Sequence, residues 1–122
     1  MSTIIDHHDG HALNGGLSIS YDHRDPNAGE ASHYYTILLD DGSQVAEVQF
    51  QHGPHNKEGS TPGCTEAVLV AIILDRLRCF QAGPYPCREN AIAITKLEEA
   101  LHRMRDRADD RAHRGVLGEY AS

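Results

Sequence analysis

The chain has 122 residues, of which 39% are hydrophobic and 24% charged, and its formal net charge is −7 at pH 7. This length suits one domain with a modest core. The acidic balance argues against a general nucleic-acid binder, which would carry a basic surplus, but a local group of arginines can still hold a small anion. Apolar runs stop short of the roughly 20 residues of a membrane span, and no secretory signal is recognisable. We therefore expect a cytoplasmic protein.

Residues 1–16 lack periodicity and are predicted to form an irregular arm. Three histidines in this arm, His7, His8 and His11, are of the residue type that binds metals. No second group of Cys or His follows at zinc-site spacing. We therefore interpret the histidines as part of a polar tail and predict neither a metal nor a cofactor.

Residues 17–52 are predicted to form an antiparallel β-meander of about three strands. Apolar and polar residues alternate from Leu17 to Tyr21, which is the pattern of a half-buried strand. The dipeptide Asp41-Gly42 favours the positive φ of a tight hairpin turn. It is the clearest turn signal of the sheet.

Residues 53–64 form a predicted Gly- and Pro-rich loop, and residues 65–114 a helical hairpin. The first helix is expected from Thr65, a good N-cap, to Phe80. Its apolar positions cover more than one stripe: Val68, Leu69, Val70, Ile72, Ile73, Leu74 and Leu77. Because a single partner helix cannot cover such a surface, we expect other subunits to do so.

The second helix is expected from Cys87 to Arg114, with Gly115 ending it and residues 115–122 as a tail. Its seam toward the first helix repeats at 3-4 spacing at Ile94, Leu97, Leu101, Met104 and Ala108. Ile92 lies off this seam and is a candidate for a second interface. The predicted fold class is α+β in a single domain, residues 1–122: an antiparallel β-meander, then a two-helix hairpin, assembling as a homo-oligomer.

No catalytic residue is predicted. Cys64 precedes a helix and lies near His52 and His55 in sequence, as a nucleophile and its base would, but a small buried residue is the simpler interpretation. Glu98 and Glu99 are neighbours in a helix and point in different directions, as on a solvated face. The cysteines are odd in number, so we expect no disulfide framework.

Arginines and aromatic residues are the candidates for binding a phosphorylated ligand. The second helix carries Arg103, Arg105, Arg107, Arg111 and Arg114, interleaved with aspartates. Spacing alone favours a salt-bridged surface, although the planar guanidinium also suits phosphate. Phe50, Phe80 and Tyr85 flank the loop and the hairpin turn, where they serve either as core residues or as stacking surfaces for a base.

Several short motifs occur together in a recognisable order: FQHGP at 50–54, DRL at 75–77, FQ at 80–81, CRENA at 87–91 and TKLEEAL at 95–101. Over residues 49–118 the chain thereby resembles the helical-hairpin domain that phage anti-Thoeris proteins share with anti-CBASS cyclic-oligonucleotide sponges. The strands predicted before the hairpin resemble the first anti-Thoeris family rather than the nearly all-helical anti-CBASS branch.

The resemblance implies a phage counter-defence sponge that is not an enzyme. Such a protein binds a cyclic ADP-ribose isomer with a 1″–3′ link tightly, without cleaving it, and so blocks Thoeris immunity. It implies a homo-oligomer, either a dimer or a hexamer built as a trimer of dimers. It also implies a second site for CBASS cyclic trinucleotides, action in the host cytoplasm, and no DNA or membrane partner.

The resemblance also implies binding residues. For the ADP-ribose isomer, Phe80 would stack, Asn90 would form hydrogen bonds, and Arg107 and Arg24 would hold the pyrophosphate. The trinucleotide site would use Phe50, Gly53, Pro54, His55, Thr61 and Thr65. The loop at 59–63 reads GSTPG instead of the Gly-x-Asn-Gly pattern expected there.

Three alternatives remain open at the level of sequence. The protein could act mainly on the cyclic di- and trinucleotides of CBASS. It could be an enzyme that degrades the signal. It could also be a structural oligomer without a ligand.

Overall fold

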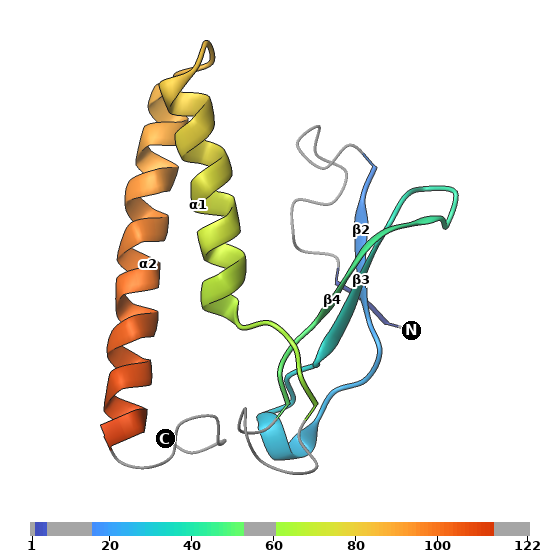
Figure 1. Ribbon diagram of the computed structural model, residues 1–122. Coiled ribbons are helices and arrows are strands. Elements are labelled where there is room, and N and C mark those ends of the chain that lie inside the picture. Colours follow the sequence, from blue (N-terminus) through green and yellow to red (C-terminus); the bar gives the residue numbers. More distant parts are fainter. Residues whose placement is uncertain (1, 5–15, 53–60, 114–122) are drawn as a thin grey trace. The chain divides into compact units, whose positions relative to one another are not determined.

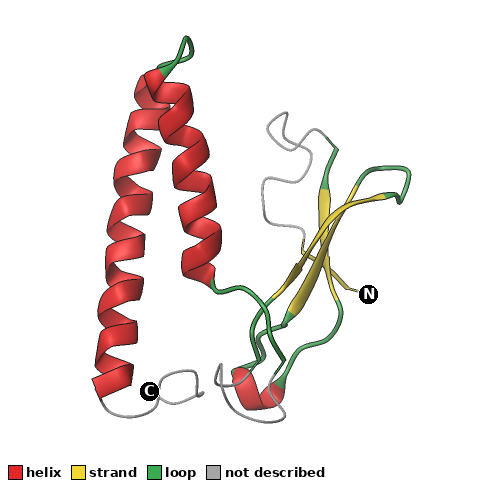
Figure 2. Cartoon of the chain, viewed as in Figure 1, coloured by secondary structure: helices red, strands yellow, loops and turns green. Residues whose placement is uncertain are grey.

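The computed structural model describes residues 2–4, 16–52 and 61–113. The chain divides between Cys64 and Thr65 into two compact units. The first unit contains the strands and a short 3-10 helix, η2 (Pro26–Ala28), and the second contains the two α-helices (Figure 2). The predicted α+β order, a meander followed by a helical hairpin, is confirmed. That the two units form one domain stays a prediction.

The sheet has four antiparallel strands in sequence order: β1 (Ser2–Ile4), β2 (Ser18–Tyr21), β3 (Tyr34–Leu38) and β4 (Gln44–Gln49). The sequence predicted β2 to β4 but not β1, which lies in the segment expected to be irregular. Three residues are too few to show a period, and β1 forms because it pairs with the edge of β2.

The turn between β3 and β4 forms at the predicted dipeptide. Gly42 has φ of 87°, and the backbone N–H of Leu39 donates to the Ser43 carbonyl at 2.9 Å. A carboxylate oxygen of Asp41 accepts from the Ser43 amide at 2.8 Å and from its hydroxyl at 2.6 Å. These hydrogen bonds lower the pKa of Asp41. The turn is therefore fixed by both backbone and side-chain bonds.

The segment after β4 is held by close backbone contacts. Phe50 forms a parallel bridge with Cys64, and the Cys64 amide donates to the Gln49 carbonyl at 2.9 Å. A Cβ on Gly63 would lie 2.5 Å from both the Gln49 carbonyl oxygen and the Phe50 carbonyl carbon. Only glycine therefore fits at Gly63.

The hairpin consists of α1 (Glu66–Ala82) and α2 (Arg88–His113), which lie side by side and antiparallel (Figure 1). Both helices begin and end within two residues of their predicted limits; the predicted terminator Gly115 lies outside the described residues. As predicted, Thr65 is the N-cap of α1, and its hydroxyl accepts from the Val68 amide at 3.3 Å.

The described part of the chain buries few apolar side chains. Leu74 on α1 is its one buried hydrophobic residue, at 1% exposure. On the same helix Val68, Ile72 and Ile73 are exposed, with Ile72 at 60%. Ile92 on α2, predicted to lie off the seam, is also exposed. Apolar surface on both helices thus remains open to another molecule.

The three cysteines are free thiols, as expected. Within the described residues, no helix is long and apolar enough to cross a bilayer.

Candidate functional site

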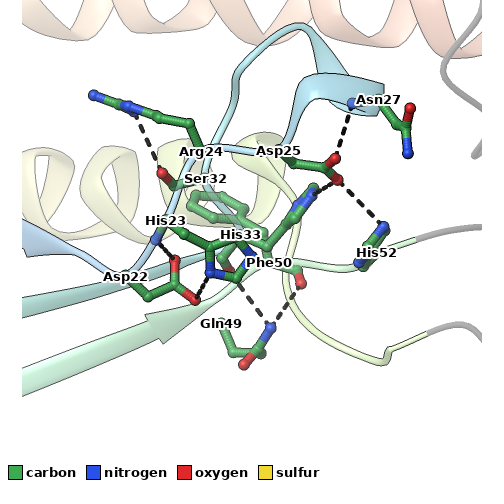
Figure 3. A network of polar contacts seen from close by, with 10 residues as sticks. All are labelled: Asp22, His23, Arg24, Asp25, Asn27, Ser32, His33, Gln49, Phe50 and His52. Carbon is green, nitrogen blue, oxygen red and sulfur yellow. Dashed lines mark hydrogen bonds and ion pairs between the residues drawn. The ribbon is translucent and has the colours of Figure 1, made fainter. Parts of the chain in front are cut away.

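Arg24 lies in the connection between β2 and β3, in the first unit (Figure 3). Its guanidinium carbon sits 3.6 Å from the centre of the Tyr21 ring, within the range of a cation–π contact. One guanidinium nitrogen donates to the Ser32 hydroxyl, which is 4% exposed, at 3.4 Å. The residue that the resemblance assigns to the pyrophosphate is therefore oriented by the protein before any ligand binds.

The next residue, Asp25, joins two histidines in a network that we name the Asp-His cluster: Asp25, His33 and His52 (Figure 3). One Asp25 oxygen lies 2.8 Å from Nε2 of His33 and 3.6 Å from Nε2 of His52. The imidazole rings stack with centroids 4.1 Å apart. The hydrogen bond to His33 is the main cause that lowers the pKa of Asp25.

The Asp-His cluster was not predicted from the sequence. His52 was a candidate only as a base for Cys64, whereas in the structure it contacts Asp25. The cluster forms because β3 and β4 pair with Tyr34 opposite Gln49, which brings the residues flanking that pair together. The residue separations resemble no metal-site motif, so only the strand register would have revealed the cluster.

Phe80 and Asn90 lie at the turn end of the hairpin. The Phe80 ring meets the Tyr85 ring edge-on with centroids 6.3 Å apart, and the Arg76 guanidinium lies over it at 4.9 Å. Asn90 is in the first turn of α2, and its backbone amide donates to the Cys87 sulfur at 3.4 Å. Arg76 thus adds a positive charge beside the predicted stacking ring, a contact that was not predicted from the sequence.

Arg107 is exposed on α2, and within the described residues its guanidinium forms no ion pair or hydrogen bond. Arg103, one turn earlier, does pair with Asp106, at 3.4 Å. The two interpretations of the α2 arginines, a salt-bridged surface and a phosphate-binding site, therefore apply to different residues. Arg103 matches the salt-bridged surface, whereas Arg107 can accept a phosphate without giving up a partner in the described part of the chain.

One hairpin cannot bring all of these side chains to one small ligand. From residue 90 to residue 107, at 1.5 Å per residue, α2 advances about 25 Å. Asn90 is near one end of this helix and Arg107 is near the other. A depression between the helices, lined by Leu74, Arg78, Glu98, Leu101, His102 and Arg105, has a volume of only about 190 Å³. That is smaller than the roughly 300 Å³ at which ligand pockets usually begin.

The residues of the second predicted site are only partly described. Phe50 contacts the Tyr35 ring edge-on at 5.7 Å, and Thr61 pairs with His52 through backbone hydrogen bonds of 2.8 and 2.9 Å. Thr65 caps α1 in the second unit. Gly53, Pro54 and His55 lie outside the described residues.

Residues 43–108 match the family model described as the Acb2/Tad1 hairpin domain. The chain belongs to the Acb2/Tad1 hairpin-domain family. The match begins just before β4 and continues through α1 into α2. It includes Phe80, Asn90 and Arg107, whereas Arg24 and β1 to β3 precede it.

The sequence of this hairpin-domain protein is similar to that of a curated protein, "Thoeris anti-defense 1" of Bacillus phage SBSphiJ7. The two are 43% identical over 83 residues, which is 68% of this chain. The aligned part spans 58% of the relative's length. The family and the relative agree with the resemblance to phage anti-Thoeris proteins.

Proposed function

We propose that this protein is a phage counter-defence sponge that sequesters a cyclic ADP-ribose isomer with a 1″–3′ link and does not cleave it. Membership of the hairpin-domain family and the 43% identity to an anti-defence protein support this proposal. The structural observation that carries it is Arg107, an exposed guanidinium without an ion partner in the described part of the chain. The proposed place of action is the host cytoplasm, where the immune signal would be met.

In the proposed complex, different residues contact different parts of the ligand. Phe80 stacks on the adenine, and Asn90 donates to or accepts from the base or ribose. Arg107 and Arg24 hold the pyrophosphate, for which the planar guanidinium offers paired donors. Tyr21 and Ser32 restrain Arg24, so part of the entropy of ordering this long side chain is lost before binding.

The proposed pocket forms between copies of the chain. The length of α2 separates Asn90 from Arg107, so a ligand that meets both kinds of residue needs at least two hairpins. The exposed apolar residues of α1 and Ile92 of α2 supply surface for such contacts. A dimer would supply the two hairpins of one pocket, and a hexamer made of three dimers would contain this arrangement three times.

A second site for cyclic trinucleotides, at Phe50, Thr61 and Thr65 with the loop between them, remains part of the proposal. The support is the family, whose hairpin domain matches through this region. A protein acting mainly on CBASS cyclic di- and trinucleotides is the alternative. Calorimetric titration with each class of ligand separates the two. Phe80→Ala should abolish binding of the ADP-ribose isomer and retain that of the trinucleotide, and equal loss of both would refute the two-site assignment.

Sequestration is distinguished from degradation by recovering the ligand. The protein is incubated with the cyclic ADP-ribose isomer, denatured by heat, and the supernatant is analysed by mass spectrometry. We expect the ligand to return intact and in stoichiometric amount. A processed product would identify an enzyme, and absence of any binding would leave a structural oligomer.

A further inference from the structure

The Asp-His cluster has the donor atoms and the spacing of a metal site. One Asp25 oxygen, His33 Nε2 and His52 Nε2 all lie within 4.8 Å of one another. The Asp25 and His33 side chains are each 13% exposed, and that of His52 is 47% exposed. In Figure 3 the two imidazole rings turn their Nε2 edges toward the same carboxylate. Solvent can therefore reach the point where the three groups meet.

We propose that Asp25, His33 and His52 bind a divalent transition-metal ion of the zinc class, with three protein ligands and one open position. Ligand atoms bound to tetrahedral Zn²⁺ lie roughly 3.4 Å from one another, given bonds of about 2.1 Å. The observed distances from Asp25 to the two histidines, 2.8 and 3.6 Å, bracket that value. Imidazole nitrogens favour zinc-class ions over Mg²⁺ and Ca²⁺, which prefer oxygen.

The backbone positions of the three ligands are fixed by other interactions. The second Asp25 oxygen accepts from the Asn27 amide at 2.9 Å, as the N-cap of the 3-10 helix η2 (Pro26–Ala28), and this leaves the first oxygen for the histidines. The His33 carbonyl accepts from the Phe50 amide at 2.7 Å. The backbone of His52 pairs with Thr61. Such support distinguishes a preorganised site from a chance meeting of surface side chains.

The orientation of the two imidazole rings must change when the metal binds. The two rings are nearly parallel, with an interplanar angle of 13°. The lone pairs of two stacked rings lie in separate, nearly parallel planes, whereas an ion bound by both rings must lie close to both ring planes. Rotation about the side-chain torsions of the more exposed His52 achieves this. Binding should therefore unstack the rings.

A bound ion would link the connection between β2 and β3, which carries Asp25 and His33, to the segment after β4, which carries His52. Arg24 directly precedes Asp25, so an ion on Asp25 restrains the backbone that carries the proposed pyrophosphate ligand. His52 directly precedes the predicted Gly- and Pro-rich loop of residues 53–64. Metal binding itself does not depend on the proposed function, and its test uses no nucleotide.

The test is a calorimetric titration of the full-length, metal-stripped protein with Zn²⁺. His7, His8 and His11 are replaced by alanine throughout and the thiols are alkylated, because imidazole and thiolate groups elsewhere in the chain would compete for Zn²⁺. We expect one equivalent per chain, with at least a tenfold loss of affinity in His52→Ala and in His33→Ala. His23→Ala is the matched control, since His23 lies on the same loop, is 74% exposed and contacts Asp22 instead.

Nitrogen NMR of labelled histidines gives a readout that does not depend on folding of the variants. Zn²⁺ should shift the Nε2 resonances of His33 and His52 and leave those of His23 in place. His52→Ala removes a half-exposed side chain, so it should keep its circular dichroism spectrum and separate loss of a ligand from loss of the fold. Failure of Zn²⁺ to bind, or an affinity of His52→Ala within twofold of the parent, would overturn the proposal.

Discussion

At the level of single residues, the arginines of this chain differ in what holds them. Arg103 is paired with Asp106, and Arg24 is held by Tyr21 and Ser32. Arg107 has no ion partner among the described residues. A phosphate arriving at Arg103 would compete with a carboxylate, whereas one arriving at Arg107 would not. Of these three arginines, Arg107 is therefore the one that can bind a phosphate without losing an existing interaction with the described residues.

Arg107→Ala should weaken binding of the cyclic ADP-ribose isomer by roughly 10- to 100-fold, the effect of losing hydrogen bonds to a charged group. Arg107→Lys should recover only part of the affinity, because a point charge does not reproduce the paired donors of guanidinium. Calorimetry measures both. The control is Arg103→Ala, for which we expect an unchanged affinity. A similar loss of affinity in Arg103→Ala would mean that the arginines of α2 act through their overall charge.

The lowered pKa of Asp25 links the stability of the first unit to pH. A carboxyl whose pKa is lower in the folded than in the unfolded state stabilises the fold above the ordinary Asp value of about 3.9, and this stabilisation is lost as the pH falls through the folded value. Urea unfolding should therefore show a difference between parent and Asp25→Asn that shrinks as the pH falls from 5 toward 3. An equal difference at every pH would contradict the assignment to this carboxylate.

Among the structural elements, the turn into the hairpin depends on backbone contact more than on side chains. The strand-like pairing of Phe50 with Cys64 leaves no space above Gly63. The atoms that a side chain would meet are backbone atoms, which cannot move aside without breaking the hydrogen bond from Cys64 to Gln49. This segment is the covalent link from the sheet to α1.

Gly63→Ala should lower the free energy of unfolding by about 1–3 kcal/mol, the usual cost of overpacking. Gly83→Ala is the comparison, because the nearest atom to its Cβ is the Cys79 carbonyl oxygen at 3.2 Å, and we expect a smaller loss there. Chemical denaturation followed by circular dichroism provides both values. Equal stability of Gly63→Ala and the parent would show that the backbone relaxes more easily than these distances indicate.

Elements with local signals were predictable from the sequence. The N-cap Thr65, the Gly-Pro turn after α1 and the dipeptide Asp41-Gly42 each specify their own backbone conformation. The strand β1 has no such signal, because it exists only through its pairing with β2. The Asp-His cluster was not predicted because it too depends on pairing between segments that are distant in the sequence. The helical positions of Phe80, Asn90 and Arg107, in contrast, followed from the predicted hairpin.

For the whole molecule, the central question is what covers the apolar surface of α1. The sequence predicted that one partner helix would not suffice, and Val68, Ile72 and Ile73 are exposed in the single chain. The separation of Asn90 from Arg107 along α2 is a second argument, because a small ligand that touches both residues, as proposed, would need a second copy. Both observations support assembly as part of the proposed mechanism.

Ile72→Glu should convert the assembly to smaller species, because burying an unpaired carboxylate in an interface is costly. Size-exclusion chromatography with light scattering measures the mass, and calorimetry on the same sample should find weaker ligand binding. Lys96→Glu, at an exposed position of α2, is the control and should change neither. A full-sized assembly of Ile72→Glu with unchanged affinity would place the subunit contact elsewhere.

The length of α2 has a consequence for how the proposed sponge would work in a cell. If the pocket is shared between copies, ligand binding and subunit association are thermodynamically linked, so each favours the other by the same free energy. Below the concentration at which copies associate, early in expression, the chains would capture little signal. As the signal accumulates, it would itself promote the assembly that removes it.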